Sequence, residues 1–179
     1  EEITPINLNV SNLSTEAKAN AKLDFNLALK SGGKFDWKAN VGVNPIFSEG
    51  GIKLDKLQLQ KVLALALSET AGFDLQGHEL FNIDYKIEQD KKNLKVTIEK
   101  TKFELKDFQF ADKSADKNLL KTPTFSIETD AIITVANNNL DVVVNKAKLD
   151  SRDLQFSNQA SDPISVSIPN FSHETDVTV

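Results

Sequence analysis

The stretch that decides the fold is NLKVTIEKTKFELKDFQF, residues 93–110, because a similar stretch occurs a second time in the chain. Residues 139–156 read NLDVVVNKAKLDSRDLQF, 46 positions later and without a gap. Apolar and polar residues alternate in both copies, as in a half-buried β-strand. The alternation slips by one residue at two places, because positions 94, 96 and 98 are apolar, then 103 and 105, then 108 and 110. A β-bulge absorbs such an extra residue and bends the strand. The repeat therefore predicts long, bent strands.

The same alternation on either side of turn sequences predicts β-hairpins. The clearest one joins residues 23–29 to residues 35–43 through Ser31-Gly32-Gly33-Lys34. Two more hairpins and two single strands follow from the same pattern: 81–87 with 94–98 across the polar link 89–93, 125–135 with 140–144 across Asn137-Asn138-Asn139, and strands at 6–10 and 164–168.

One segment has a different period. Residues 57–69, LQLQKVLALALSE, place Leu59, Val62, Leu63, Ala66 and Leu67 on one helical face, and Gly72 follows as a stop signal. The Leu-Ala alternation in this run also permits a strand. We predict a mainly β fold: a long, bent antiparallel sheet of repeated hairpins curled into a groove or half-barrel, with one short α-helix at about residues 57–69.

The apolar face of such a sheet is too large to be shielded by the predicted helix alone. About ten strands spaced ~4.8 Å apart, each about 24 Å long, expose roughly 1,100 Å² on one face. A helix of 13 residues shields only on the order of 200 Å². Monomers rarely expose apolar patches beyond a few hundred Å². The face is therefore expected either to close on itself as a sandwich or barrel, or to bind something apolar.

Composition and motifs favour no catalytic chemistry. Lysines are interspersed with acids at a net charge of −5, so no basic face for nucleic acid is expected, and there are no cysteines. His78 and His173 lie far apart, so we predict no metal, no cofactor and no enzyme activity. Asp107 with Gln109 resembles a carboxylate site, but its return as Asp153 with Gln155 favours a repeated bulge or inter-strand bond. Ser31–Lys34 precedes a strand and lacks phosphate-loop spacing.

The chain contains no methionine and no apolar run of 18 residues. We therefore expect Glu1 to be an internal position and residues 1–179 to form a single β-groove segment of a larger protein. PINLNVSNLS at 5–14 is similar to PISVSIPNFS at 163–172, so residues 163–179 are expected to begin a following unit.

The order of motifs over residues 5–160 resembles the AsmA-like superfamily of bacterial envelope proteins, in particular its domain-of-unknown-function-748 branch. The Gly-Gly hairpin is followed by Asn44-Pro45, Gly50-Gly51, the segment 57–67, and Leu75-Gln76-Gly77 leading into an aromatic strand. These fill the places of that family's Pro-containing link, its Gly before a short strand, its short helix and its leucine-to-glycine step. The family's more typical tyrosine in the helix segment is absent here.

The resemblance implies a bridge-like lipid-transfer function. Such a protein is periplasmic, is anchored at the inner membrane through parts outside this segment, and holds acyl chains in an apolar β-groove that continues through neighbouring segments of the same chain. The expected function is binding or guiding phospholipid, or another acyl-chain ligand, between inner and outer membrane, in outer-membrane biogenesis or lipid homeostasis. The alternative is a structural or scaffolding β-domain with a closed core and no lipid ligand.

The groove residues that we predict are the alternating apolar side chains. They are Leu23, Phe25, Leu27, Phe35, Trp37, Val41, Phe81, Ile83, Tyr85, Leu94, Val96, Ile98, Phe125, Ile127, Leu140, Val142 and Val144.

Overall fold

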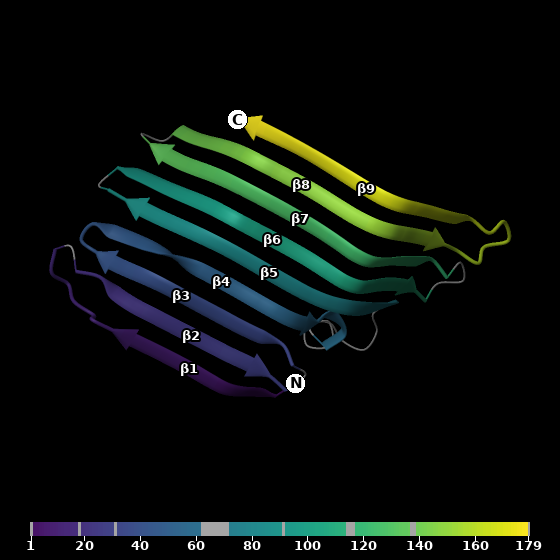
Figure 1. Ribbon diagram of the computed structural model, residues 1–179, viewed down its shortest axis with the longest axis horizontal. Coiled ribbons are helices and arrows are strands. Elements are labelled where there is room, and N and C mark those ends of the chain that lie inside the picture. Colours follow the sequence, from purple (N-terminus) through teal and green to yellow (C-terminus); the bar gives the residue numbers. More distant parts are fainter. Residues whose placement is uncertain are drawn as a thin grey trace.

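The described part of the chain forms one nine-stranded antiparallel sheet in which the strands follow one another in sequence order (Figure 1). The computed structural model describes residues 2–17, 19–30, 32–61, 72–90, 92–113, 117–136 and 139–178. The strands are β1 Ile3–Ser11, β2 Ala21–Leu29, β3 Lys34–Val43, β4 Ile46–Gln58, β5 Phe73–Gln89, β6 Asn93–Asp112, β7 Leu119–Ala136, β8 Asn139–Ser157 and β9 Ser165–Thr178. The predicted mainly β fold of repeated hairpins is confirmed.

The predicted hairpins are confirmed, and their turns have simple physical causes. Gly32 links β2 to β3 with a φ of 100°, a conformation that glycine adopts without a steric penalty. Between β5 and β6, the Asp90 carboxylate accepts hydrogen bonds from the backbone N–H groups of Lys92 and Asn93 at 3.0 and 2.9 Å. These bonds hold the pKa of Asp90 below its usual value.

The segment around β4 differs from the sequence-based expectation. β4 runs through residues 46–58 as a full strand, so Gly50 and Gly51 lie inside a strand rather than before one. The helix does not begin at residue 57, because Leu57 and Gln58 pair with Glu79 and His78 of β5. Residues 59–61 are helical, and the rest of the predicted helix lies outside the described residues.

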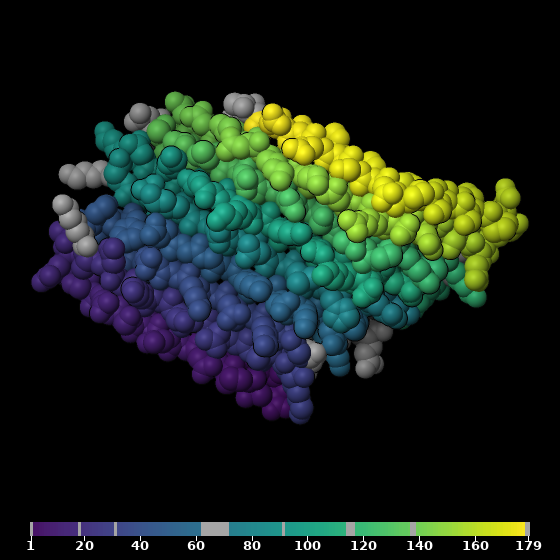
Figure 2. Space-filling model, viewed as in Figure 1, coloured from purple at the N-terminus to yellow at the C-terminus, as the bar shows by residue number. Residues whose placement is uncertain are grey.

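The sheet is open. Each described strand contacts only its neighbours in sequence, and β1 and β9 form opposite edges (Figures 1 and 2). The described strands therefore form neither a sandwich nor a closed barrel, and the closed core considered above is wrong for this part of the chain.

Both predicted phase slips are bulges in β6. At the first, Ile98 pairs with Ala131 but Thr101 pairs with Thr129, so β6 carries one residue more than β7. Lys100 is left-handed there with a φ of 51°, and its freed N–H donates to the Asp130 carboxylate at 2.7 Å. β8 has the equivalent extra residue, because Asp130 pairs with Lys146 while Ala131 pairs with Val144.

The second phase slip, between residues 105 and 108 of β6, is matched by an extra residue in each of β7, β8 and β9. Asp107 of β6 and Asp153 of β8 are left-handed, with φ values of 51° and 46°, and both lie opposite Pro123 of β7. Asp153 also lies opposite Pro169 of β9. We call these four residues the cross-sheet line. Next to this line, on β5, lies Gly77, which has a φ of 134° and faces the extra residue of β6.

Along the cross-sheet line the register stays continuous from β6 to β9, because every strand carries the same extra residue. Only the border with β5 is a true bulge, since Gln76 pairs with Gln109 while His78 pairs with Lys106. Extra residues bend strands and increase their twist, and the ribbons of β6 to β9 curve along their length (Figure 1).

Gly77→Ala is expected to destabilise the protein by about 1–3 kcal/mol, because its φ of 134° suits glycine and a Cβ would lie 3.1 Å from the Lys106 carbonyl oxygen. Gly72→Ala is the matched control, since a Cβ there meets nothing within 4 Å. Urea denaturation of both variants checks this. Equal stability of the two variants would contradict the role assigned to Gly77.

Candidate functional site: an uncovered apolar face

Cross-strand pairing separates the sheet into an apolar and a polar face. Leu54, Phe81, Phe103, Ile127 and Leu149 lie opposite one another in one row across β4 to β8. Because directly paired residues share a face and neighbours along a strand alternate, the adjacent row belongs to the other face. That row reads Lys53, Asn82, Lys102, Glu128, Lys148 and Glu174.

Every predicted groove residue lies on the apolar face. One row contains Leu27, Phe35, Phe81 and Ile127, and the next contains Phe25, Trp37 and Ile83. Further rows hold Leu23, Tyr85, Ile98 and Val144, then Val41, Ile87, Val96 and Val142, then Leu94 and Leu140, while Phe125 pairs with Leu105. The bulges keep these side chains together despite the phase slips.

No described element covers this face. The buried hydrophobic side chains are small ones, Ala21 and Ala39, and no large side chain is fully buried in the described chain. Ile127 is 38% exposed in the middle of the sheet, and Leu140 is 63% exposed. In an ordinary domain these side chains would be packed against a second layer. Here they meet solvent.

An apolar hollow with a volume of about 490 Å³ lies beside the cross-sheet line, over β6 to β9. Large side chains form its walls and two small hydroxyl residues, Thr122 and Ser151, lie among them. The large ones are Leu105, Phe108, Leu120, Phe125, Leu149, Leu154, Ile168 and Phe171. Its volume is in the range of pockets that bind a small apolar ligand.

The hydroxyl groups of the hollow are satisfied within the sheet. Thr122 Oγ1 lies 2.8 Å from the Arg152 carbonyl oxygen, 2.9 Å from the Thr124 carbonyl oxygen and 3.3 Å from Ser151 Oγ. Pro123 has no N–H to offer β8, and the Thr122 hydroxyl donates at this break in the ladder instead. The hollow therefore makes no hydrogen-bonding demand on a ligand, which suits a hydrocarbon.

A second polar group on this face is also satisfied. The Tyr85 hydroxyl accepts a hydrogen bond from Trp37 Nε1 at 2.9 Å and lies 3.0 Å from Ser48 Oγ. Gly50 lies between Ala39 and Tyr85 in the cross-strand row, and a Cβ on it would clash with the Lys38 carbonyl oxygen. Glycine at this position therefore lets β4 pair with β3 without a steric clash.

Glu79 is a carboxylate within the apolar face, between Leu57 and Leu105. Burial raises its pKa above the usual 4.5. Because the folded pKa is above the unfolded one, the cost to stability is fully present above the folded pKa and disappears below the unfolded pKa.

Glu79→Gln is therefore expected to raise the free energy of unfolding at pH 7, because it removes the cost of the desolvated charge. The gain over wild type should shrink as the pH falls towards 4.5, since the wild-type carboxyl then becomes protonated. Urea denaturation of both proteins at pH 7 and pH 4.5 measures the difference. A gain that does not change with pH would contradict this account.

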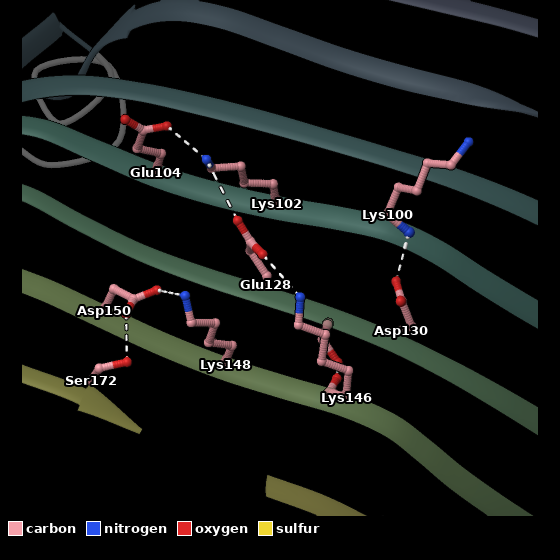
Figure 3. Close-up of polar contacts among 10 residues, drawn as sticks. Lys100, Lys102, Glu104, Glu128, Asp130, Lys146, Lys148, Asp150 and Ser172 are labelled. Atoms are coloured by element: carbon pink, nitrogen blue, oxygen red, sulfur yellow. Dashed lines mark hydrogen bonds and ion pairs between the residues drawn. The ribbon is translucent and has the colours of Figure 1, made fainter. Parts of the chain in front are cut away.

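The polar face is an alternating ion-pair ladder (Figure 3). Glu128 of β7 lies between Lys146 of β8, 3.2 Å away, and Lys102 of β6, 3.5 Å away. The hydrogen bond from Lys146 holds the pKa of Glu128 below its usual value, although burial opposes the shift. Lys148 and Ser172 lower the pKa of Asp150 in the same way, at 2.8 and 2.6 Å.

A depression of about 570 Å³ on this polar face is lined by the same ladder, with Lys106 and Arg152 at its far end. Lys106 lies 3.4 Å from Glu104, and Lys102 lies 3.5 Å from the same carboxylate. Four cationic side chains and three carboxylates line the depression, so most of the charges are balanced, and the ladder is a hydrated structural surface and a weak candidate for a ligand site.

The residues considered as catalytic or metal-binding candidates do not lie together in the sheet. His78 pairs with Lys106 on the polar face and His173 pairs with Leu149 on the other face. Among the described residues no group of three metal-binding side chains is found. Asp107 and Asp153 are the left-handed residues of the cross-sheet line, so their repetition has a structural cause. No helix in the described chain is long and apolar enough to cross a membrane.

Apart from Phe125, the lining of the hollow was missed in the sequence. A signal was available, because PTFSIETD at 123–130 returns 46 positions later as PNFSHETD at 169–176. Extending the repeat by this strand aligns Pro123 with Pro169 and Phe125 with Phe171. The repeat unit is thus a pair of strands, β6 with β7 and β8 with β9.

Comparison with known proteins adds no family. No family model matches the chain, and neither a curated protein nor a solved structure matches it. The resemblance to AsmA-like proteins therefore stays a hypothesis.

Proposed function

We propose that this chain is a non-enzymatic lipid-binding segment whose apolar face holds the acyl chains of phospholipid. The observation that carries the proposal is the continuous apolar face of an open sheet, with large side chains such as Ile127 and Leu140 left exposed. Patches larger than a few hundred Å² mark interaction surfaces.

Acyl chains fit this surface because it is apolar and because its polar groups need no hydrogen bond from a ligand. The polar groups of the hollow, Thr122 and Ser151, are hydrogen-bonded, and so is Tyr85. Each methylene transferred from water to such a surface gains about 0.8 kcal/mol. The charged ladder lies on the opposite face, in water, so a bound lipid would leave the ion pairs hydrated.

The cellular setting of the proposal comes from the family resemblance. The segment would act in the periplasm, within an inner-membrane-anchored protein, with neighbouring segments extending the groove towards the outer membrane. Support from this chain is the repeat unit of two strands, since repeated units extend a sheet without changing its cross-section.

Purified protein tests the proposal directly. Native mass spectrometry and lipid extraction are expected to show co-purified phospholipid, and the delipidated protein should bind an apolar fluorescent dye. Lipid-free protein that also fails to bind the dye would overturn the proposal and favour a scaffolding role, in which another protein covers the face.

A further inference from the structure

The outer edge of β9 is an unpaired strand edge 14 residues long, and no described strand lies beside it. The Asn158 N–H donates to the Ile164 carbonyl oxygen at 3.0 Å, so Ile164 faces β8. Because hydrogen-bonding directions alternate along an antiparallel strand, the N–H groups of Ser165 and Ser167 point outward. Such an edge is a template for another strand.

The outer edge of β9 presents the same pattern of residues that β7 presents to β8. β9 repeats β7 at an offset of 46 residues, including Pro123 as Pro169, Glu128 as Glu174 and Asp130 as Asp176. β7 is paired on both sides, to β6 and to β8, whereas β9 is paired to β8 alone. The side of β9 that faces solvent corresponds to the side of β7 that receives β8.

The extra residue in β9 restricts the possible partners. Phe171 and Ile168 share the apolar face although they are three positions apart, because Pro169 lies between them. A regular strand paired along β9 would turn its side chains to the wrong face on one side of Pro169. A strand with its own extra residue, as Asp153 supplies opposite Pro123, keeps its apolar side chains on one face.

The ion-pair ladder also stops at this edge. Glu128 bridges Lys102 on the preceding strand and Lys146 on the following one. Its repeat counterpart Glu174 lies opposite Lys148, the counterpart of Lys102. No described lysine takes the place of Lys146 beside Glu174, so this carboxylate has an empty position on its outer side.

We propose that the β9 edge binds one further strand of the β8 type. That strand carries a lysine to meet Glu174 and, beyond it, a left-handed residue followed by an apolar-Gln-apolar sequence, as in Asp153-Leu154-Gln155-Phe156. Matching of the extra residues, rather than hydrophobicity, selects the partner. The proposal does not depend on what occupies the apolar face.

The probe is a synthetic peptide of residues 139–157, which reproduces β8, labelled for fluorescence anisotropy and added to delipidated full-length chain. We expect saturable binding, and binding at least about tenfold weaker for the same peptide without Asp153, because the deletion misplaces Leu154 and Phe156. Equal affinity of the two peptides, or no binding of the first, would overturn the proposal whether or not the protein binds lipid.

Two variants of the chain test whether the peptide binds at the β9 edge. Ser167→Pro removes an outward N–H and leaves the bonds to β8, so it should abolish binding without unfolding the protein. Glu174→Gln should weaken binding by about two- to fivefold and reduce its salt dependence. Peptide binding that survives Ser167→Pro would overturn the edge as the site. A dimer of the free chain that Ser167→Pro dissociates would also overturn it, since the occupant would then be a second copy.

Discussion

Deletion of Asp153 is expected to lower the free energy of unfolding by about 2 kcal/mol or more, because the strand beyond it loses its phase. Leu154 and Phe156, which are partly buried, would turn towards the polar face. Full burial of such a side chain contributes roughly 1.5–3 kcal/mol, so losing partial burial at both positions costs about 2 kcal/mol. A typical domain has only about 5–15 kcal/mol in total. Urea denaturation followed by circular dichroism measures the loss.

Asp153→Gly is the matched control for this deletion. It removes the side chain but keeps the extra residue, and glycine adopts the φ of 46° more readily than aspartate does. Its stability should stay within about 1 kcal/mol of wild type. Similar losses for the deletion and the substitution would mean that the Asp153 side chain, not the phase of the strand, is what matters.

A compensating variant tests the whole cross-sheet line. Removing its extra residue from all four strands restores regular alternation and makes β6 regular against β5. We expect this quadruple deletion to unfold cooperatively and to be more stable than the single deletion. If it is less stable, the line is not a register device. The four deleted residues are Asp107, Pro123, Asp153 and Pro169.

Val142→Asp is expected to reduce bound phospholipid at least about tenfold, because a charge on the apolar face must be desolvated by the acyl chain that covers it. Val142 lies in the row of Val96 and Ile133 on that face. The protein should remain folded, since no second layer packs on this side chain.

Val143→Asp is an unusually close control. It makes the same change one residue along the same strand, but Val143 pairs with Ile132 on the opposite face. Both side chains are partly exposed. Phospholipid per protein, measured after extraction, should fall for Val142→Asp and stay near the wild-type level for Val143→Asp. Equal losses in the two variants, or none in either, would contradict the assignment of the apolar face.

The strands and bulges could be predicted because each depends on a short stretch of sequence. The slips between residues 98 and 103 and between 105 and 108 indicate bulges, and Lys100 and Asp107 are the left-handed residues there. The face of each apolar side chain followed from the same alternation. The stretch IKLDKLQL at residues 52–59 has a similar pattern, and Lys56, which precedes Leu57-Gln58-Leu59, is left-handed too, with a φ of 57°.

The hollow could not be predicted in the same way, because it depends on which strands lie side by side and in what register. Thr122 has no apolar periodicity to mark it, and its place follows from the break in the ladder at Pro123. The start of the helix was also wrong for a non-local reason. Leu57 and Gln58 have residues of β5 to pair with, and that pairing prevails over their helix propensity.

The 46-residue offset determines how the width of the sheet can change when part of the gene is duplicated or deleted. Because the extra residues, the prolines and the charged residues of the ladder recur with one period, removing or adding a whole period changes the number of strands by two and keeps the same kind of junction between neighbouring strands. Each step alters the width of the sheet by roughly 9.6 Å. Any shorter insertion would bring a left-handed residue beside a regular one. Genetic duplication of this chain is thus expected to be tolerated in whole periods only, so that its reach can be adjusted in discrete increments.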